Sequence, residues 1–173
     1  YMVSRGATTI WESWGGVREG FVGYNTSEDS MVMFVTIERF FYNDILGIQG
    51  PKYFGVDDFT PGFRSFSIEP CPVGDLTWAK GHIKTVRGTV AVDWERSGDS
   101  FSLNVAVPVG ATARVAIPKL GLTGVTVTEG ATTIWSEGKP GDSVEGIDRM
   151  SEDADRVHLE VGSGEYRFVL RTP

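Results

Sequence analysis

The stretch FSLNVAVPVGATARVAIP, residues 101–118, decides the fold class. Apolar side chains recur at every second position on both sides of Pro108-Val109-Gly110, which is a typical turn sequence. Alternation with period two is typical of strands that bury one face only. The stretch therefore predicts two strands, over 100–107 and 111–117, joined by a short turn.

The same pattern extends in both directions along the chain. The turns Ser97-Gly98-Asp99 and Gly162-Ser163-Gly164 separate further alternating segments. Short strands at roughly ten-residue spacing favour a mainly β protein with an antiparallel, jelly-roll-like β-sandwich. The polar and acidic segment 137–156 is predicted to be a long surface loop. Further strands are predicted over 63–68, 78–86, 88–96, 123–128, 131–136, 156–161 and 164–171.

A helix is predicted over 28–47, before the strands. Ser27 or Asp29 can cap its start, and Gly47 is a natural stop. Its apolar side chains cover most of its circumference, which is typical of a buried helix. Nothing else in the chain looks helical enough to bury it, so we expect the chain to begin within a larger fold. In this chain alone the apolar residues of the helix, such as Met31, Phe34 and Phe41, should be exposed.

The charge and the composition of the chain exclude some classes of binding partner. The net charge is −7, from 16 basic and 23 acidic residues. This balance argues against nucleic acid and against anionic membranes, and it suits a neutral or polyol ligand. No apolar run reaches the ~20 residues that span a bilayer. Cys71 is the only cysteine, which excludes an intramolecular disulfide and a thiolate metal site.

A carboxylate lies between two tryptophans near the start, in GATTIWESW, residues 6–14. Indole faces stack on sugar rings, and a carboxylate among them is typical of glycoside chemistry. The alternatives are a solvated Glu12, core packing of Trp11, and ordinary loop roles for the other residues. The candidate catalytic residue is Glu12, and the candidate substrate-binding residues are Trp11, Trp14, Tyr24 and Asn25.

Three segments together resemble the C-terminal part of bacterial α-L-rhamnosidases of glycoside hydrolase family 78. The first is GATTIWESW, and the second is Met33-Phe34 with Phe41-Tyr42 and Leu46-Gly47-Ile48. The third is PGFRSFSIEPCPVGDLTWAKGHIKTVRGTVAVDW, 61–94, followed by 101–118 and by VGSGEYRF, 161–168. The resemblance implies that residues 1–50 are the terminal segment of an (α/α)6-barrel catalytic domain. Residues 51–173 would be the C-terminal β-sandwich domain.

The resemblance also implies a reaction. The family inverts the anomeric carbon of L-rhamnose, and Glu12 matches the position of its general base. The partner acid would lie in the missing upstream barrel, so this chain alone should be inactive. The implied substrate is a rhamnose-containing glycoside or polysaccharide. One departure is Ser30-Met31, where the family usually has an Asn-His pair whose histidine contacts the sugar, and this leaves the sugar specificity open.

The residues alone leave other functions of the sandwich open. The sandwich could be a non-catalytic carbohydrate-binding module or a purely structural one. Trp78 and Trp94 are predicted core residues, with a secondary carbohydrate platform as the alternative. Asp57-Asp58 is expected to face solvent rather than to bind calcium, and His82 and His158 lack metal-ligand spacing. No cofactor or metal is expected, and the sequence does not distinguish a cytoplasmic, periplasmic or secreted location.

Overall fold

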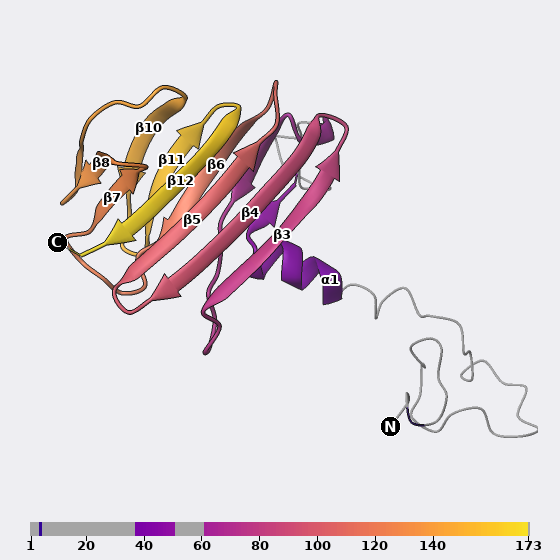
Figure 1. Ribbon diagram of the computed structural model, residues 1–173, viewed down its shortest axis with the longest axis horizontal. Helices are drawn as coiled ribbons and strands as arrows, with labels where there is room; N and C mark the ends of the chain where they lie inside the picture. The colour runs from indigo at the N-terminus through magenta and orange to yellow at the C-terminus, as the bar shows by residue number, and fades with distance from the viewer. Residues whose placement is uncertain (1–3, 5–36, 51–60, 173) are drawn as a thin grey trace, which may run out of the picture. The chain divides into compact units, whose positions relative to one another are not determined.

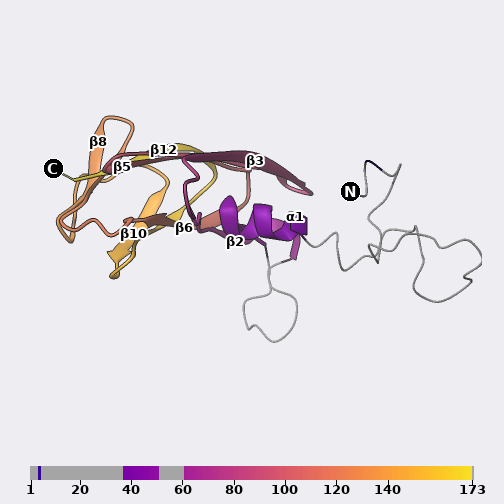
Figure 2. The ribbon, with the colours of Figure 1, turned by 90° about the horizontal axis from the view of Figure 1, so that it is seen from below.

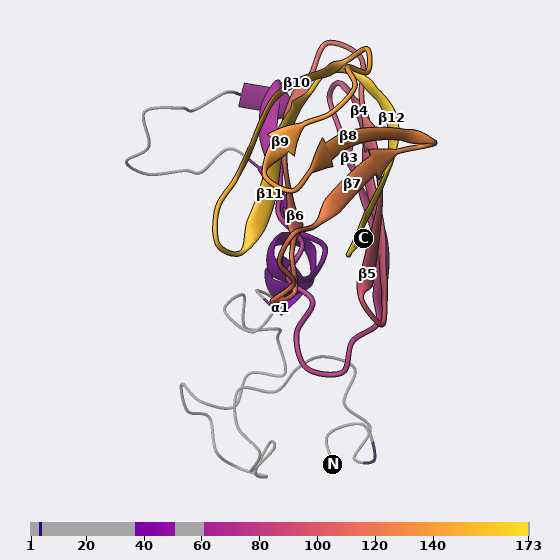
Figure 3. The ribbon, with the colours of Figure 1, turned by 90° about the vertical axis from the view of Figure 1, so that its left-hand side faces the viewer.

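Two β-sheets packed face to face make up most of the chain that the structure describes. The computed structural model describes residue 4, residues 37–50 and residues 61–172. The chain divides into two compact units, Tyr1–Phe40 and Phe41–Pro173, and both sheets belong to the second unit. Figures 2 and 3 show the two layers from their edges.

The larger sheet has seven strands within the described residues, and Figure 1 looks onto its outer face. All its neighbouring strands are antiparallel. In spatial order the strands are β3 (Trp78–Thr85), β4 (Gly88–Ser97), β5 (Ser100–Val107), β12 (Gly164–Arg171), β7 (Thr126–Glu129), β8 (Thr132–Ser136) and β9 (Lys139–Pro140).

The smaller sheet has five strands in the same part of the chain. Its pairs are antiparallel except β2 with β6, which run parallel with Ser65 opposite Thr112. In spatial order the strands are β1 (Ile48–Gln49), β2 (Ser65–Ile68), β6 (Thr112–Pro118), β11 (Arg156–Val161) and β10 (Ile147–Glu152).

The core fills the space between the sheets with alternate side chains from each strand. In β4 the inward residues are Val90, Val92 and Trp94, and each is almost completely buried. The Trp94 ring stacks on Phe101 of β5 with ring centroids 5.7 Å apart. The predicted period-two pattern is therefore the pattern that buries the core, and the predicted β-sandwich is confirmed.

One sequence prediction about the strands is wrong. Residues 137–156 are not a long loop, because they contain β9 and β10. β10 lies at the edge of the smaller sheet, and four of its six residues are exposed. Ile147 and Met150 of this strand pack against the core, but a β-bulge between Asp148 and Met150 places them three residues apart. The sequence IDRMSE therefore lacks period-two alternation and resembles a polar loop.

The end of the predicted helix is described as two short pieces. They are the α-helical turn α1 (Ile37–Arg39) and the π-helical turn η3 (Phe40–Ile45). Phe41 is 53% exposed, as predicted, whereas Met31 and Phe34 lie outside the described residues. None of the helices in residues 37–50 and 61–172 has the length and apolar character needed to cross a bilayer.

The last residues of this helix are buried, which corrects the expectation that its apolar side chains would all be exposed. Ile45 and Leu46 are each 6% exposed and belong to the sandwich core. The Leu46 side chain packs over Gly81 of β3, where a Cβ would collide with it. The indole of Trp94 donates to the Ile45 carbonyl oxygen over 2.9 Å. The sandwich therefore covers Ile45 and Leu46 at the helix end, whereas Phe41 of the same unit is exposed.

Candidate functional site

The residues that the sequence singles out for catalysis cannot be placed. Glu12, Trp11, Trp14, Tyr24 and Asn25 all lie outside the described residues, and so does Asp57-Asp58. Their roles therefore stay predictions, and the site geometry that follows comes from the sandwich.

The two sandwich tryptophans have different environments. Trp94 is in the core, as predicted. The prediction for Trp78 is wrong, because its side chain is 65% exposed. Trp78 opens the edge strand β3, in which every second residue from Trp78 onward is exposed, including Lys80 and His82. The indole therefore stands on the outer face of the larger sheet, and alternation alone did not reveal which face of β3 would be buried.

A hollow of about 680 Å³ lies over the larger sheet and spans β3, β4, β5 and β12. We call it the outer-face hollow. Strand register places two rows of outward side chains across these four strands. The first row is His82, Ala91, Ala106 and Glu165, and the second is Lys80, Asp93, Asn104 and Arg167.

Two small residues form the floor of the outer-face hollow. Ala91 of β4 lies directly opposite Ala106 of β5, and both are only half-buried although they lie mid-strand. His82 and Glu165 border them within the first row, and Asp93 and Asn104 of the second row border them on one side. A methyl floor between long side chains makes a depression in an otherwise flat sheet face.

Polar groups of both signs line the outer-face hollow. The Lys80 ammonium is 2.9 Å from the Asp93 carboxylate. In the described part of the chain, four exposed side chains of the two rows make no hydrogen bond or ion pair. They are His82, Asn104, Glu165 and Arg167. The hollow therefore offers solvated donors and acceptors above a small apolar floor.

Sequence reasoning missed this site for a physical reason. The polar residues alternate with core residues in predicted strands, which looks like an ordinary wet face. Only the register brings Ala91 opposite Ala106 and aligns the polar residues into rows. The sequence nevertheless contains a signal, because Trp78, Lys80 and His82 alternate within one predicted strand and therefore share one of its faces.

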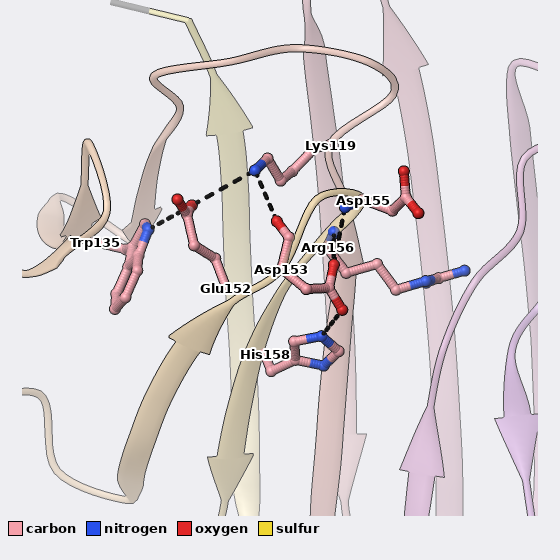
Figure 4. A network of polar contacts seen from close by, with 7 residues as sticks. All are labelled: Lys119, Trp135, Glu152, Asp153, Asp155, Arg156 and His158. Atoms are coloured by element: carbon pink, nitrogen blue, oxygen red, sulfur yellow. Dashed lines mark hydrogen bonds and ion pairs between the residues drawn. The ribbon is translucent and has the colours of Figure 1, made fainter.

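A second polar cluster involves residues of β8, β10 and β11 (Figure 4). The Glu152 carboxylate accepts a hydrogen bond from the Trp135 indole over 3.1 Å and lies 3.7 Å from the Lys119 ammonium. The buried Lys119 also donates to the main-chain carbonyl of Asp153 over 2.9 Å. Because Trp135 belongs to one sheet and Glu152 to the other, this cluster joins the two sheets.

The turn after β10 completes that cluster. Asp153 accepts hydrogen bonds from the main-chain N–H groups of Asp155 and Arg156, each over 2.8 Å, and its other oxygen lies 2.8 Å from His158 Nε2. The contact with His158, followed by the two N–H groups, lowers the pKa of Asp153 from 3.8 to about 2. These polar groups satisfy one another, so the arrangement is structural. Across residues 37–50 and 61–172 no group of acidic, histidine and cysteine side chains could hold a metal ion.

Comparison with known proteins gives the family. Residues 55–132 match the family described as the bacterial alpha-L-rhamnosidase C-terminal domain. An α-L-rhamnosidase of Alteromonas sp. (strain LOR) is 33% identical over 120 residues, which are 68% of this chain and 12% of that protein. This chain contains the C-terminal domain of the bacterial α-L-rhamnosidase family. The resemblance seen in the sequence is thereby confirmed.

Solved structures extend the likeness of this α-L-rhamnosidase C-terminal domain. The α-L-rhamnosidase of Dictyoglumus thermophilum has 32% sequence identity and a TM-score of 0.75, over 99% of this chain and 17% of that one. The Streptomyces avermitilis α-L-rhamnosidase, solved in complex with L-rhamnose, has 24% identity and a TM-score of 0.60, over 98% of this chain and 14% of that one. The latter supports the fold alone.

The share of the relatives that is matched is small. The chain spans only 12% to 14% of the length of the curated α-L-rhamnosidases. The family match over residues 55–132 includes β3, β4 and β5, which carry most of the outer-face hollow. In this chain the outer-face hollow is therefore separate in sequence from the predicted catalytic residue, Glu12.

Proposed function

We propose that the chain works as the C-terminal portion of a glycoside hydrolase that cleaves a rhamnose-containing glycoside or polysaccharide. The observation that carries this proposal is the likeness along the whole chain to α-L-rhamnosidases, above all the structure with 32% identity over 99% of the chain. Residues 1–50 supply the terminal segment of the catalytic barrel, and residues 51–173 form the sandwich domain.

Glu12 is the general base in this proposal. Inverting glycosidases place two carboxyl groups ~6.5–9.5 Å apart, one to protonate the leaving oxygen and one to take a proton from water. Glu12 takes the water's proton, and an acid from the upstream barrel protonates the leaving group. Trp11 and Trp14 contribute indole faces that stack on the sugar ring, and Tyr24 and Asn25 lie in the same cleft.

The sandwich acts as a brace for the catalytic segment. Its core buries Ile45, Leu46 and Ile48, and Trp94 holds the Ile45 carbonyl by a hydrogen bond. The Trp94 bond and the packing of Leu46 over Gly81 fix the end of η3 to the inner face of the larger sheet, and Ile48 continues into β1 of the smaller sheet. A fixed helix end limits the freedom of the residues that precede it, which is what a positioned general base requires.

The test uses the full-length protein that contains this chain, with an aryl α-L-rhamnoside as substrate. Glu12→Gln keeps the shape but cannot accept the proton, so we expect kcat to fall about 10²–10⁴-fold with KM little changed. Glu28→Gln is the matched control, because Glu28 is predicted to stand at the helix start, and it should keep near-normal kcat.

The stereochemistry of the product gives an independent readout. NMR at early times should show β-L-rhamnose first, as inversion demands. Near-normal kcat in Glu12→Gln would remove Glu12 from the role of base, and α-L-rhamnose as the first product would contradict inversion. Turnover by the 173-residue chain alone would contradict the need for an upstream acid.

A further inference from the structure

The dimensions of the outer-face hollow suit a small linear ligand. Its two rows of side chains cross four neighbouring strands, which at ~4.8 Å per strand gives a length of about 14 Å. The rows stand two residues apart, or about 7 Å. The volume of about 680 Å³ lies within the ~300–1,000 Å³ range of small-molecule sites. A ligand of two or three sugar rings has this shape.

The charges of the hollow favour an uncharged ligand. Lys80 and Arg167 stand against Asp93, Glu165 and the neighbouring Glu129, so positive and negative groups nearly balance. A phosphate, a sulfated chain or a nucleic acid needs an excess of cations, and a basic peptide needs an excess of carboxylates. The hollow has no excess of cations, and its carboxylates outnumber its cations by only one.

The solvated polar groups supply donors and acceptors together. The Arg167 guanidinium only donates, the Glu165 carboxylate only accepts, and the Asn104 amide does both. Sugar hydroxyls also donate and accept hydrogen bonds. Adjacent hydroxyls of one sugar can therefore bond to neighbouring donor and acceptor side chains of the hollow. The Ala91 and Ala106 methyl groups leave room for a ring to approach the sheet.

Trp78 adds an aromatic surface at the edge of the hollow. It lies two residues before Lys80 on the same face of β3, and its side chain is 65% exposed. A large aromatic side chain left this open on a strand is unusual, and its face can stack on a sugar ring.

From these four observations we propose that the outer-face hollow, with Trp78 at its edge, is a non-catalytic binding site for a neutral oligosaccharide. The site involves no residue before Trp78, so this inference does not rest on the role proposed for Glu12. A sandwich that holds a sugar chain would keep a polymeric or multiply glycosylated substrate near the enzyme by raising its effective concentration.

The test is an NMR titration of the full 173-residue chain with assigned backbone amides. The probes are rutinose, which is a neutral rhamnosyl-glucose disaccharide, cellobiose as a second neutral disaccharide, and digalacturonate as an anion of similar size. At millimolar concentrations at least one neutral probe should give saturable shifts confined to β3, β4, β5 and β12. Digalacturonate should bind more weakly than that probe.

Two arginines provide a matched pair of variants. Arg167 and Arg171 are both exposed on the outer face of β12, but only Arg167 lines the hollow. Arg167→Ala should weaken binding about tenfold, because a hydrogen bond from a charged group is lost, and Arg171→Ala should leave binding unchanged. Trp78→Ala should weaken binding several-fold, since it removes the stacking surface. All three positions are exposed, so the unliganded spectra should show that the fold is kept.

Several outcomes would overturn the proposal. They are the absence of saturable shifts with both neutral probes, shifts centred elsewhere on the chain, and tighter binding of digalacturonate. Equal effects of Arg167→Ala and Arg171→Ala, or unchanged binding in Trp78→Ala, would also overturn it. None of these results bears on hydrolysis by the full-length protein, so failure of this inference is distinct from failure of the proposed function.

Discussion

The indole N–H of Trp94 donates to the main-chain carbonyl of Ile45 over 2.9 Å, and both residues are buried. The bond joins β4, the second strand from one edge of the larger sheet, to the end of η3, 49 residues earlier in the chain. A buried carbonyl at a helix end has no other donor nearby in the helix itself, so a side chain from the sheet satisfies it.

Replacing Trp94 by phenylalanine should therefore destabilise the sandwich strongly. Trp94→Phe leaves the Ile45 carbonyl unsatisfied and opens a cavity beside Phe101, and we expect a loss of about 2–4 kcal/mol in the free energy of unfolding. Urea unfolding followed by circular dichroism measures it. Trp78→Phe is the control on the neighbouring strand and should change stability by less than about 0.5 kcal/mol. Equal losses in the two variants would show that the burial of Trp94 does not matter.

We predict that the buried ammonium of Lys119 contributes more to the free energy of unfolding than an exposed lysine ammonium does. Lys119→Met keeps the aliphatic stem but leaves the Asp153 carbonyl and the Glu152 carboxylate without their cation, which should cost about 1–3 kcal/mol in unfolding experiments. Lys80→Met is the control, because the Lys80 side chain is 71% exposed in its pair with Asp93. It should cost no more than about 0.5 kcal/mol. A Lys80→Met loss as large as that of Lys119→Met would contradict this ranking.

Asp153 should titrate at unusually low pH. Its pKa is lowered to about 2 by His158 and the N–H groups of Asp155 and Arg156. A carboxyl whose pKa is lower in the folded state stabilises the fold above its ordinary value of 3.8, and this contribution is lost as the pH falls through about 2. Carbon-detected NMR of the Asp153 carboxyl should give a midpoint well below 3.8, and His158→Gln should raise that midpoint.

Stability measurements test the same relation between the pKa of Asp153 and the pH dependence of the free energy of unfolding. The difference in unfolding free energy between the wild type and Asp153→Asn should shrink between pH 5 and pH 2, because asparagine does not titrate. A wild-type midpoint at or above 3.8, or parallel pH profiles for the two proteins, would show that the turn does not hold the carboxylate in its charged form.

Strands that bury one face, and a helix end marked by a glycine, can be predicted from neighbouring residues in the sequence alone. β5 and β6 were predicted to within one residue, because each buries one face and so alternates. The sequence predicts that Gly47 ends the helix, and Gly47 has a positive φ of 81° two residues after the last helical residue, Ile45. These features need no knowledge of the partner strand.

Features that depend on pairing were not predictable in this way. The parallel pairing of β2 with β6 joins segments almost fifty residues apart, and nothing within either strand encodes its direction. β10 lacks alternation because a β-bulge between Asp148 and Met150 separates its two core-facing residues, Ile147 and Met150, by three positions. The outer-face hollow exists only through register, and the outward direction of Trp78 depends on which face of β3 the helix end covers. The predicted catalytic residues depend on the family resemblance for their roles, because one carboxylate between tryptophans does not define a site.

The last prediction separates backbone conformation from lack of space at two glycines with the same φ. Gly47 has φ 81° and Gly121 has φ 80°. A Cβ at Gly121 would meet no atom within 4 Å, whereas one at Gly47 would overlap the main chain of Glu69 and Pro70. Gly121→Ala should therefore cost only the left-handed penalty of about 1 kcal/mol.

Gly47→Ala should cost that penalty and the overlap as well, about 3–5 kcal/mol in total. The neighbouring backbone cannot move away freely, because the Gly47 carbonyl accepts a hydrogen bond from the Glu69 N–H over 2.8 Å at the start of the β1–β2 pairing. Urea unfolding of both variants measures the difference, and a Gly47→Ala chain that does not fold at all counts as the larger loss. Equal costs at the two positions would mean that the helix end can shift away from β2, and the contact that fixes it to the sandwich would be weaker than its burial indicates.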